Sequence, residues 1–170
     1  PIASPVALPV VAKAEPVNEA VAPAHASPGA RTAATLSASN TLKLNLSKAI
    51  YRVGDAVRFE VVSADSAYLY CFLHNNNGRL QRIFPNRFAS QPRIEAGVPV
   101  LLPGTPRFAL IAEGGVQPER IGCIAVPREI TKDLPEPLQR DDFADLGIRS
   151  FEEIAAAFSR AARTPLAVAS

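Results

Sequence analysis

The sequence predicts a mainly β fold, namely an immunoglobulin-like β-sandwich of about seven short strands with a short helical C-terminal appendage. Three observations support this prediction. The region 42–127 begins with apolar and polar residues that alternate with a period of two. Turn-forming residues separate short apolar runs throughout that region. A helical period then replaces the strand period from about residue 133. A small β-barrel is the competing architecture.

The first predicted strands come with turns whose chemistry is recognisable. Residues 42–46 alternate between leucine and polar side chains, which is typical of a strand with one solvated face. In the turn at 51–55, Gly54 is suited to a positive φ. Residues 57–62 form the next predicted strand. Residues 68–73 are apolar on both faces, so this strand is expected to lie centrally in a sheet.

The later strands are bounded by turn and breaker residues. Asn75-Asn76-Asn77-Gly78 predicts a hairpin whose turn has two positive φ angles. Pro85 ends the returning strand because it has no N–H to donate to a ladder. We expect the remaining strands at residues 80–84, 98–102, 107–112 and 119–126, with a further edge strand at 165–169.

The C-terminal region has the signals of helices. Ser150 and Glu153 have capping-box spacing and predict a helix over 150–162. A shorter helix is predicted over 140–146, where Gly147 would stop it. The longer helix has one apolar stripe, formed by Phe151, Ile154, Ala155 and Phe158. This stripe would cover an open end or edge of the sandwich, or alternatively it would be a docking surface for another protein.

The N-terminal region has a different composition. Residues 1–38 are dominated by Ala, Pro, Val and Ser, and they predict a disordered Ala/Pro-rich linker before a β-sandwich domain over 39–170. Such segments often follow an export signal or a lipid anchor. No apolar run of the chain approaches the ~20 residues of a membrane span. We therefore expect membrane attachment only through a removed or upstream anchor.

The length and charge limit the function classes. The 170 residues can hold one domain of ordinary size with tails. Eighteen Lys and Arg residues against sixteen Asp and Glu residues give a net charge of +2. This charge is too balanced for a dedicated nucleic-acid binder, so no nucleic-acid partner is expected.

The order of the motifs resembles a known family. The chain contains in succession LxLxLS, YRVGDxV, YLYxFL, NxxGxLxxIFPN, AGxPVLLP and IxCIAVP. This order resembles domain-of-unknown-function (DUF) family 4384 over about residues 41–165. Members occur in bacterial proteins, often exported or attached to kinase-like, protease-like or envelope-assembly partners. The resemblance implies an accessory, ligand-presenting or scaffold role, and it brings no catalytic residues.

The two cysteines of the chain are a departure from the pattern of that family. Cys71 falls in the predicted central strand and Cys123 in the last strong strand. Their separation resembles a disulfide across a sandwich, in the oxidising compartment of an exported protein. The alternative is two buried free thiols that act as small apolar side chains.

The chain offers little for catalysis or metal binding. His25 lies in the predicted linker, and His74 ends a strand. His74 would be a base only beside a carboxylate such as Asp65 or Glu113, and a solvent-facing strand end is the simpler interpretation. The acids at 141, 142 and 145 are expected to complement a helix dipole rather than to bind calcium. We therefore expect no enzyme, no cofactor and no metal.

The candidate contact loop is basic. Arg79, Arg82, Arg87 and Arg93 surround the Phe-Pro-Asn turn, with Phe84 and Phe88 interleaved. Arginines beside aromatics bind anionic groups, although a solvated face with Phe84 in the core has the same pattern. Reversing the charges of Arg82 and Arg87 is expected to weaken partner capture without lowering stability. The predicted contact residues are Arg79, Arg82, Phe84, Pro85, Asn86 and Arg87.

These observations favour a non-enzymatic accessory or scaffold module. We expect it in the periplasm or otherwise exported to the bacterial cell envelope, where it would contact another protein of an envelope or secretion assembly. The alternative is a domain that senses or binds glycan, peptidoglycan or another small ligand. A pocket lined by Tyr68 and Tyr70 would favour the sensor, and a flat apolar or edge-strand surface would favour protein contacts.

Overall fold

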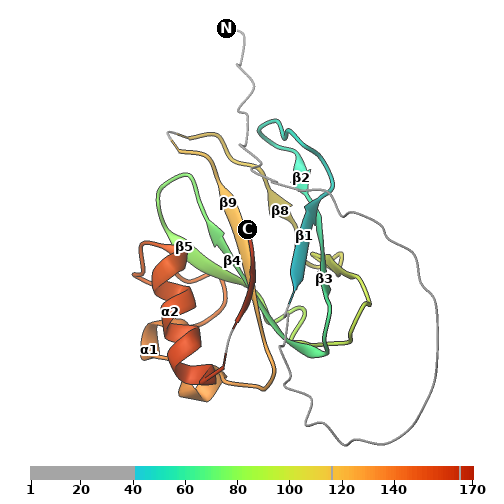
Figure 1. Cartoon of the computed structure of the whole chain (residues 1–170). Helices are drawn as coiled ribbons and strands as arrows, with labels where there is room; N and C mark the ends of the chain where they lie inside the picture. Colours follow the sequence, from blue (N-terminus) through green and yellow to red (C-terminus); the bar gives the residue numbers. More distant parts are fainter. Residues whose placement is uncertain (1–40, 116, 165) are drawn as a thin grey trace, which may run out of the picture.

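The computed structural model describes residues 41–115, 117–164 and 166–170 (Figure 1). The predicted linker at 1–38 therefore lies outside the described residues. The mainly β class is confirmed, since ten strands and only three short helical segments form the described part. The strands are β1 (Leu42–Leu46), β2 (Ala56–Val57), β3 (Phe59–Ser63), β4 (Ala67–His74), β5 (Leu80–Phe84), β6 (Arg93–Ile94), β7 (Val100–Leu102), β8 (Leu110–Ile111), β9 (Arg120–Val126) and β10 (Ala167–Ala169). The helical segments are η1 (Thr131–Asp133), α1 (Glu136–Gln139) and α2 (Phe151–Ala162).

The strands form antiparallel sheets. One sheet has the order β1-β3-β7, and a larger one has the order β10-β9-β4-β5 with β6 also paired to β4. A two-stranded sheet joins β2 to β8. The single strand predicted at 57–62 is in fact two strands that pair with different partners. The chain changes partner at Arg58, whose carbonyl accepts from the Ser47 N–H at 2.9 Å and the Tyr51 hydroxyl at 3.1 Å.

Strand β4 is central, as its two apolar faces predict. It pairs with β9 on one side and with β5 and β6 on the other. Successive side chains of a strand point to opposite faces. Leu69 and Cys71 accordingly join one hydrophobic cluster, and Tyr70 and Phe72 join another.

The first hydrophobic cluster lies between strands of the two larger sheets. Phe59 and Val61 of the β1-β3-β7 sheet share it with Leu69 of β4 and Ala125 of β9. All four side chains are at most 2% exposed. Apolar surface removed from water in this way is the main source of stability in such a domain.

Helix α2 covers the other face of the larger sheet. Figure 1 shows α2 on the side of β4, β5 and β9 that faces away from β1 and β3. Its buried residues Ile154 and Phe158 pack in the second cluster with Tyr70 and Phe72. The helix begins after Ser150, whose side chain accepts from the Glu153 N–H at 3.3 Å, so the predicted capping box is present. None of the described helices is long and apolar enough to cross a membrane.

The predicted helix at 140–146 is wrong. The short helix α1 ends at Gln139, and the chain then runs along the outer edge of β5. The Phe143 N–H donates to the Arg82 carbonyl at 3.0 Å, and the Leu146 N–H donates to the Leu80 carbonyl at 2.9 Å. Pairing with this edge satisfies backbone groups that a helix would have satisfied internally, and it also covers an exposed strand edge.

The hairpin between β4 and β5 is present, with a different turn from the one predicted. Only Gly78 has a positive φ in it, at 73°. The Asn75 side chain accepts from the N–H groups of Asn77 at 3.1 Å and Arg79 at 2.9 Å. This side-chain pattern supports a longer turn that ends in a left-handed glycine. The predicted C-terminal edge strand is present as β10, which pairs with β9.

Candidate functional site

Arg82 of the predicted contact loop is bound within the chain. Its Nη1 donates to the Leu138 carbonyl at 3.2 Å, and its Nη2 donates to the Arg140 carbonyl at 2.9 Å. The Leu138 carbonyl lies in the last turn of α1, and the Arg140 carbonyl begins the segment that leaves it. Arg82 therefore fixes that segment against β5 and explains in part why the helix does not continue.

Arg87 makes a two-pronged ion pair with Asp142. Its Nε lies 3.0 Å from Asp142 Oδ2, its Nη2 lies 3.1 Å from Oδ1, and its backbone N–H also donates to Oδ2 at 3.0 Å. The hydrogen bonds from the Arg87 side chain are the main reason that the pKa of Asp142 lies below its usual range. The prediction that Asp142 complements a helix dipole is therefore wrong, because no helix begins there.

The other two arginines make weaker pairs. Arg79 lies 3.6 Å from Asp145, and Arg93 lies 3.4 Å from Glu95. Each of these four side chains is about half exposed or more. Exposed pairs of this kind contribute little to stability because water and salt screen them.

The Phe-Pro-Asn turn is organised by Asn86, which is buried. Its Nδ2 donates to the Ile83 carbonyl at 2.6 Å, and its Oδ1 accepts from the N–H groups of Phe88 at 2.8 Å and Ala89 at 2.9 Å. Phe84 is only 4% exposed and belongs to the first cluster. The polar groups of this turn are thus used to shape it, and the contact role of its residues stays a prediction.

The Arg87–Asp142 pair predicts a pH-dependent stability. The folded-state pKa of Asp142 is lowered, so its contribution is fully present above the unfolded value of about 4 and is lost as the pH falls below it. Asp142→Asn should therefore lower the free energy of unfolding at pH 7, and the difference from the native chain should shrink below pH 4. Urea titrations at pH 7, 5 and 3 measure this.

Asp145→Asn is the matched control, because its pair with Arg79 is longer and more exposed. It should have a several-fold smaller effect at pH 7. Equal effects of the two variants would contradict the structural role of the Arg87–Asp142 pair. By the same reasoning, we now expect that reversing the charges of Arg82 and Arg87 lowers stability.

Three phenylalanines from separate segments meet beside this turn. Phe88 stacks on Phe108 with ring centroids 6.2 Å apart and an interplanar angle of 14°. Phe143 packs against Phe108 at 4.8 Å and against Phe88 at 6.5 Å. Phe88 is 40% exposed, whereas the other two are half-buried. We call Phe88, Arg107, Phe108 and Phe143 the Phe88 surface.

A positively charged residue adjoins one of these rings in the sequence. Arg107 precedes Phe108 and is exposed, and it makes no ion pair within the described part of the chain. By contrast, the charge of Arg87 is neutralised by Asp142. The Phe88 surface thus combines aromatic rings with one cation that has no carboxylate of its own among the described residues.

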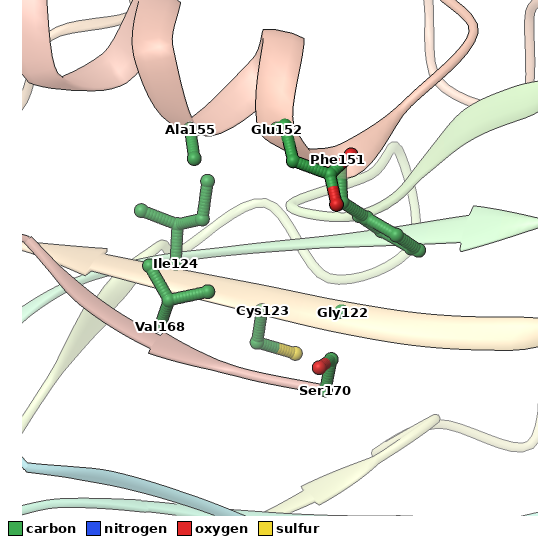
Figure 2. Close-up of a pocket in the computed structure, with 8 residues that line it drawn as sticks. All are labelled: Gly122, Cys123, Ile124, Phe151, Glu152, Ala155, Val168 and Ser170. Carbon is green, nitrogen blue, oxygen red and sulfur yellow. The ribbon is translucent and has the colours of Figure 1, made fainter.

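A small pocket lies elsewhere, between α2 and strands β9 and β10 (Figure 2). Its volume is about 170 Å³. The lining residues are Gly122, Cys123, Ile124, Phe151, Glu152, Ala155, Val168 and Ser170. Most of these present apolar surface, while Glu152 and Ser170 supply a carboxylate and a hydroxyl. The pocket is large enough for one apolar side chain or a similarly small group.

Cys71 and Cys123 form a disulfide in the structure. They are direct partners on β4 and β9, with Cα atoms 4.1 Å apart. The expected bridge across two sheets is therefore wrong, because the bond joins neighbouring strands of one sheet. Figure 2 shows the Cys123 sulfur on the side of β9 away from α2, which is the side of the first cluster.

His74 stands at the end of β4 and contacts an aromatic ring. Its ring centroid lies 6.2 Å from that of Phe151. The charged residue opposite it on β9 is Arg120 rather than an acid. Within residues 41–115, 117–164 and 166–170, no three His, Cys, Asp or Glu side chains are grouped so as to hold a metal ion.

Comparison with known proteins gives one family. Residues 50–129 match the sequence model described as Domain of unknown function (DUF4384). The match is shorter than the resemblance over 41–165, and it ends before α1, α2 and β10. No curated protein and no solved structure matches the chain.

Proposed function

We propose, from the premise that residues 50–129 of this chain belong to the DUF4384 family, that the protein is a non-enzymatic accessory or scaffold module that acts through protein contacts. The observation that carries the proposal is the Phe88 surface. Aromatic residues and arginine are enriched in protein interfaces and are frequent hot spots. Three aromatic rings in mutual contact, with the exposed Arg107 next to Phe108 in the sequence, match that composition.

The location we propose is the bacterial periplasm or another exported position at the cell envelope, within an envelope or secretion assembly. The Cys71–Cys123 disulfide supports it, because disulfides persist mainly in oxidising compartments. Anchoring would come from a removed or upstream element. The partner would be another envelope protein.

We also infer that the domain is a β-sandwich of immunoglobulin-like kind. The shared cluster between the β1-β3-β7 sheet and the larger sheet supports this inference. An arrangement of this kind leaves the loops at its ends free to carry contacts on a rigid scaffold. The Phe88 surface is built from three such connecting segments.

Protein contact is favoured over ligand sensing by the position of the tyrosines. Tyr70 is 1% exposed, its hydroxyl lies 3.3 Å from Glu129 and 3.1 Å from Thr131, and its ring packs on Phe158. The pocket of Figure 2 is lined by neither Tyr68 nor Tyr70. The pocket of Figure 2 is therefore not the tyrosine-lined pocket that would have favoured a glycan sensor.

Site-specific photo-cross-linking tests the proposal. A benzophenone-bearing phenylalanine analogue replaces Phe88 in one variant and Leu101 in a control. Leu101 is 67% exposed and lies on β7, in the other large sheet. After illumination of envelopes from the native host, position 88 should give a discrete protein adduct and position 101 should give much less. Isolated peptidoglycan incubated with the native chain and with Phe88→Ala tests the alternative.

Equal cross-linking at both positions, or none at position 88, contradicts a protein contact at this surface. Co-sedimentation with peptidoglycan that requires Phe88 would replace the scaffold proposal with the glycan-binding one. Phe88→Ala should remain folded because the side chain is 40% exposed and lies outside both buried clusters. If this variant no longer binds the partner, the loss would then come from the change at the surface and not from unfolding.

A further inference from the structure

We propose that the Cys71–Cys123 disulfide is a site of thiol–disulfide exchange, attacked at Cys123 by a dithiol when strand β10 opens. Both cysteine side chains are 0% exposed, so a thiolate cannot reach either sulfur while the strands around them are in place. Exchange therefore needs an opening, and the strands beside the bond decide which sulfur it uncovers. The bond takes no part in the contact proposed for the Phe88 surface.

The disulfide belongs to a row of residues that crosses the larger sheet. Cys71 on β4 and Cys123 on β9 are direct register partners. The row continues beyond Cys71 to Phe84 of β5 and beyond Cys123 to Ala169 of β10. A thiolate attacks one sulfur from the side opposite the sulfur that departs. Attack on Cys123 therefore comes from β10, whereas attack on Cys71 would come from β5.

The cover on the β5 side is firm. Phe84 has a large side chain that is 4% exposed and belongs to the first cluster. Its strand pairs with β4 along one edge, and along the other edge it accepts hydrogen bonds from the backbone of Phe143 and Leu146. Opening this side would break both sets of backbone contacts and would expose an aromatic ring to water.

The cover on the β10 side is slight. Strand β10 has three residues and, among the strands that the structure describes, it pairs only with β9 (Figure 1). Ala167 and Ala169 each bring only a methyl group to the first cluster, and Val168 is 51% exposed. Segments that bury little apolar surface open locally at a lower free-energy cost than the whole domain. We therefore expect β10 to open before β5 does.

Opening of β10 uncovers Cys123 without separating the two cysteines. All seven residues of β9 pair with β4, so this ladder keeps Cys71 and Cys123 together when β10 leaves. The pocket between α2 and the two strands already borders this position, because Cys123, Val168 and Ser170 are among its lining residues (Figure 2). A reagent that approaches across this edge of the sheet meets Cys123 before Cys71.

The exchange transfers two electrons and two protons to the protein. One thiolate of the dithiol attacks Cys123 Sγ, the S–S bond breaks, and the Cys71 sulfur leaves as a thiolate that takes up a proton. The second thiol of the reagent, once deprotonated, attacks the reagent sulfur of the mixed disulfide and releases the Cys123 thiolate, which is protonated in turn. The reagent leaves as a disulfide. The stability of the domain then depends on the thiol–disulfide balance around it, because reduction removes a cross-link.

The urea dependence of the reduction rate tests the opening. The native full chain is reduced by dithiothreitol at pH 8, below its unfolding transition, and alkylation followed by mass spectrometry counts the free thiols. Loss of β10 exposes little surface, so the rate should rise by less than about twofold between 0 and 1 M urea. Access by global unfolding would instead raise the rate by about fivefold or more. A rate that follows the unfolding equilibrium in this way would overturn the inference.

Two alanine-to-glycine variants locate the opening. Ala167 on β10 and Ala67 on β4 are 1% and 3% exposed, and both pack in the first cluster. Because glycine weakens a strand, Ala167→Gly should speed reduction of the disulfide by about two- to fivefold. Ala67→Gly should leave the rate unchanged. Equal acceleration by the two variants, or none by Ala167→Gly, would contradict the role of β10.

Two single-cysteine variants test which sulfur is attacked. Cys71→Ala and Cys123→Ala both lack the bond, and each keeps one thiol. In the folded chains, Cys123 of the first variant should react with the aromatic disulfide DTNB at least tenfold faster than Cys71 of the second. Equal rates, or a faster reaction of Cys71, would rule out preferred attack at Cys123.

Discussion

Phe158→Ala is expected to lower the free energy of unfolding by about 3–5 kcal/mol, the usual cost of truncating a fully buried aromatic side chain. Phe158 is 0% exposed. Its ring lies edge-on to Tyr70 at 5.0 Å and to Phe72 at 5.9 Å, so truncation leaves a cavity at the centre of the second cluster. Urea or guanidinium titration followed by circular dichroism measures the change.

Phe88→Ala is the matched control for this variant. It removes the same atoms from a side chain that is 40% exposed and that packs against the rings of Phe108 and Phe143. It should cost about 1 kcal/mol or less. A cost for Phe158→Ala as small as that of Phe88→Ala would contradict the packing of α2 on the larger sheet.

Removing the disulfide should have a comparable effect. The double variant Cys71→Ala/Cys123→Ala is expected to lose about 2–5 kcal/mol of unfolding free energy. The two cysteines are 52 positions apart, for which loop-closure entropy in the unfolded chain alone gives about 4 kcal/mol. Both side chains are fully buried, so a small loss of packing adds to this term.

A reductant separates the bond from the packing. Under reducing conditions the unfolding free energy of the native chain should fall most of the way to that of the double variant. The unfolding free energy of the double variant itself should not change. A thiol assay on the unfolded native chain should find no free thiols without reductant and two with it. Two free thiols without reductant would contradict the bond between β4 and β9.

Much of the fold was accessible from local sequence patterns. The leucine alternation of 42–46 gave β1, and the doubly apolar stretch at 68–73 gave the central strand β4. The capping box at Ser150 gave the start of α2. Each of these signals acts within a few residues along the chain, which is why sequence alone could reveal it.

The errors concern groups that meet only in three dimensions. The polar run at 140–146 has helix-compatible residues, yet the free edge of β5 and the Arg82 guanidinium hold it as an irregular segment with a turn at 141–144. The disulfide was expected across two sheets because strand order cannot be read from cysteine spacing. The arginine loop resembled an anion site, whereas Arg87 finds its carboxylate 55 positions away at Asp142.

The aromatic cluster was missed for the same reason. Phe88, Phe108 and Phe143 come from segments that share no periodic pattern, and only Phe88 was noted beside the contact loop. A signal was nevertheless present, since each of the three follows a charged residue directly. That composition indicates an interface more readily than a core.

The contact role of the Phe88 surface is measured most directly by the cross-linking yield at position 88, compared with that at position 101, in native envelopes. A discrete protein adduct at position 88, several-fold stronger than any adduct at position 101, is expected. Similar yields at the two positions, in chains that both remain folded, would contradict a contact role for the Phe88 surface. The neighbouring Phe-Pro-Asn turn would then have only a structural role.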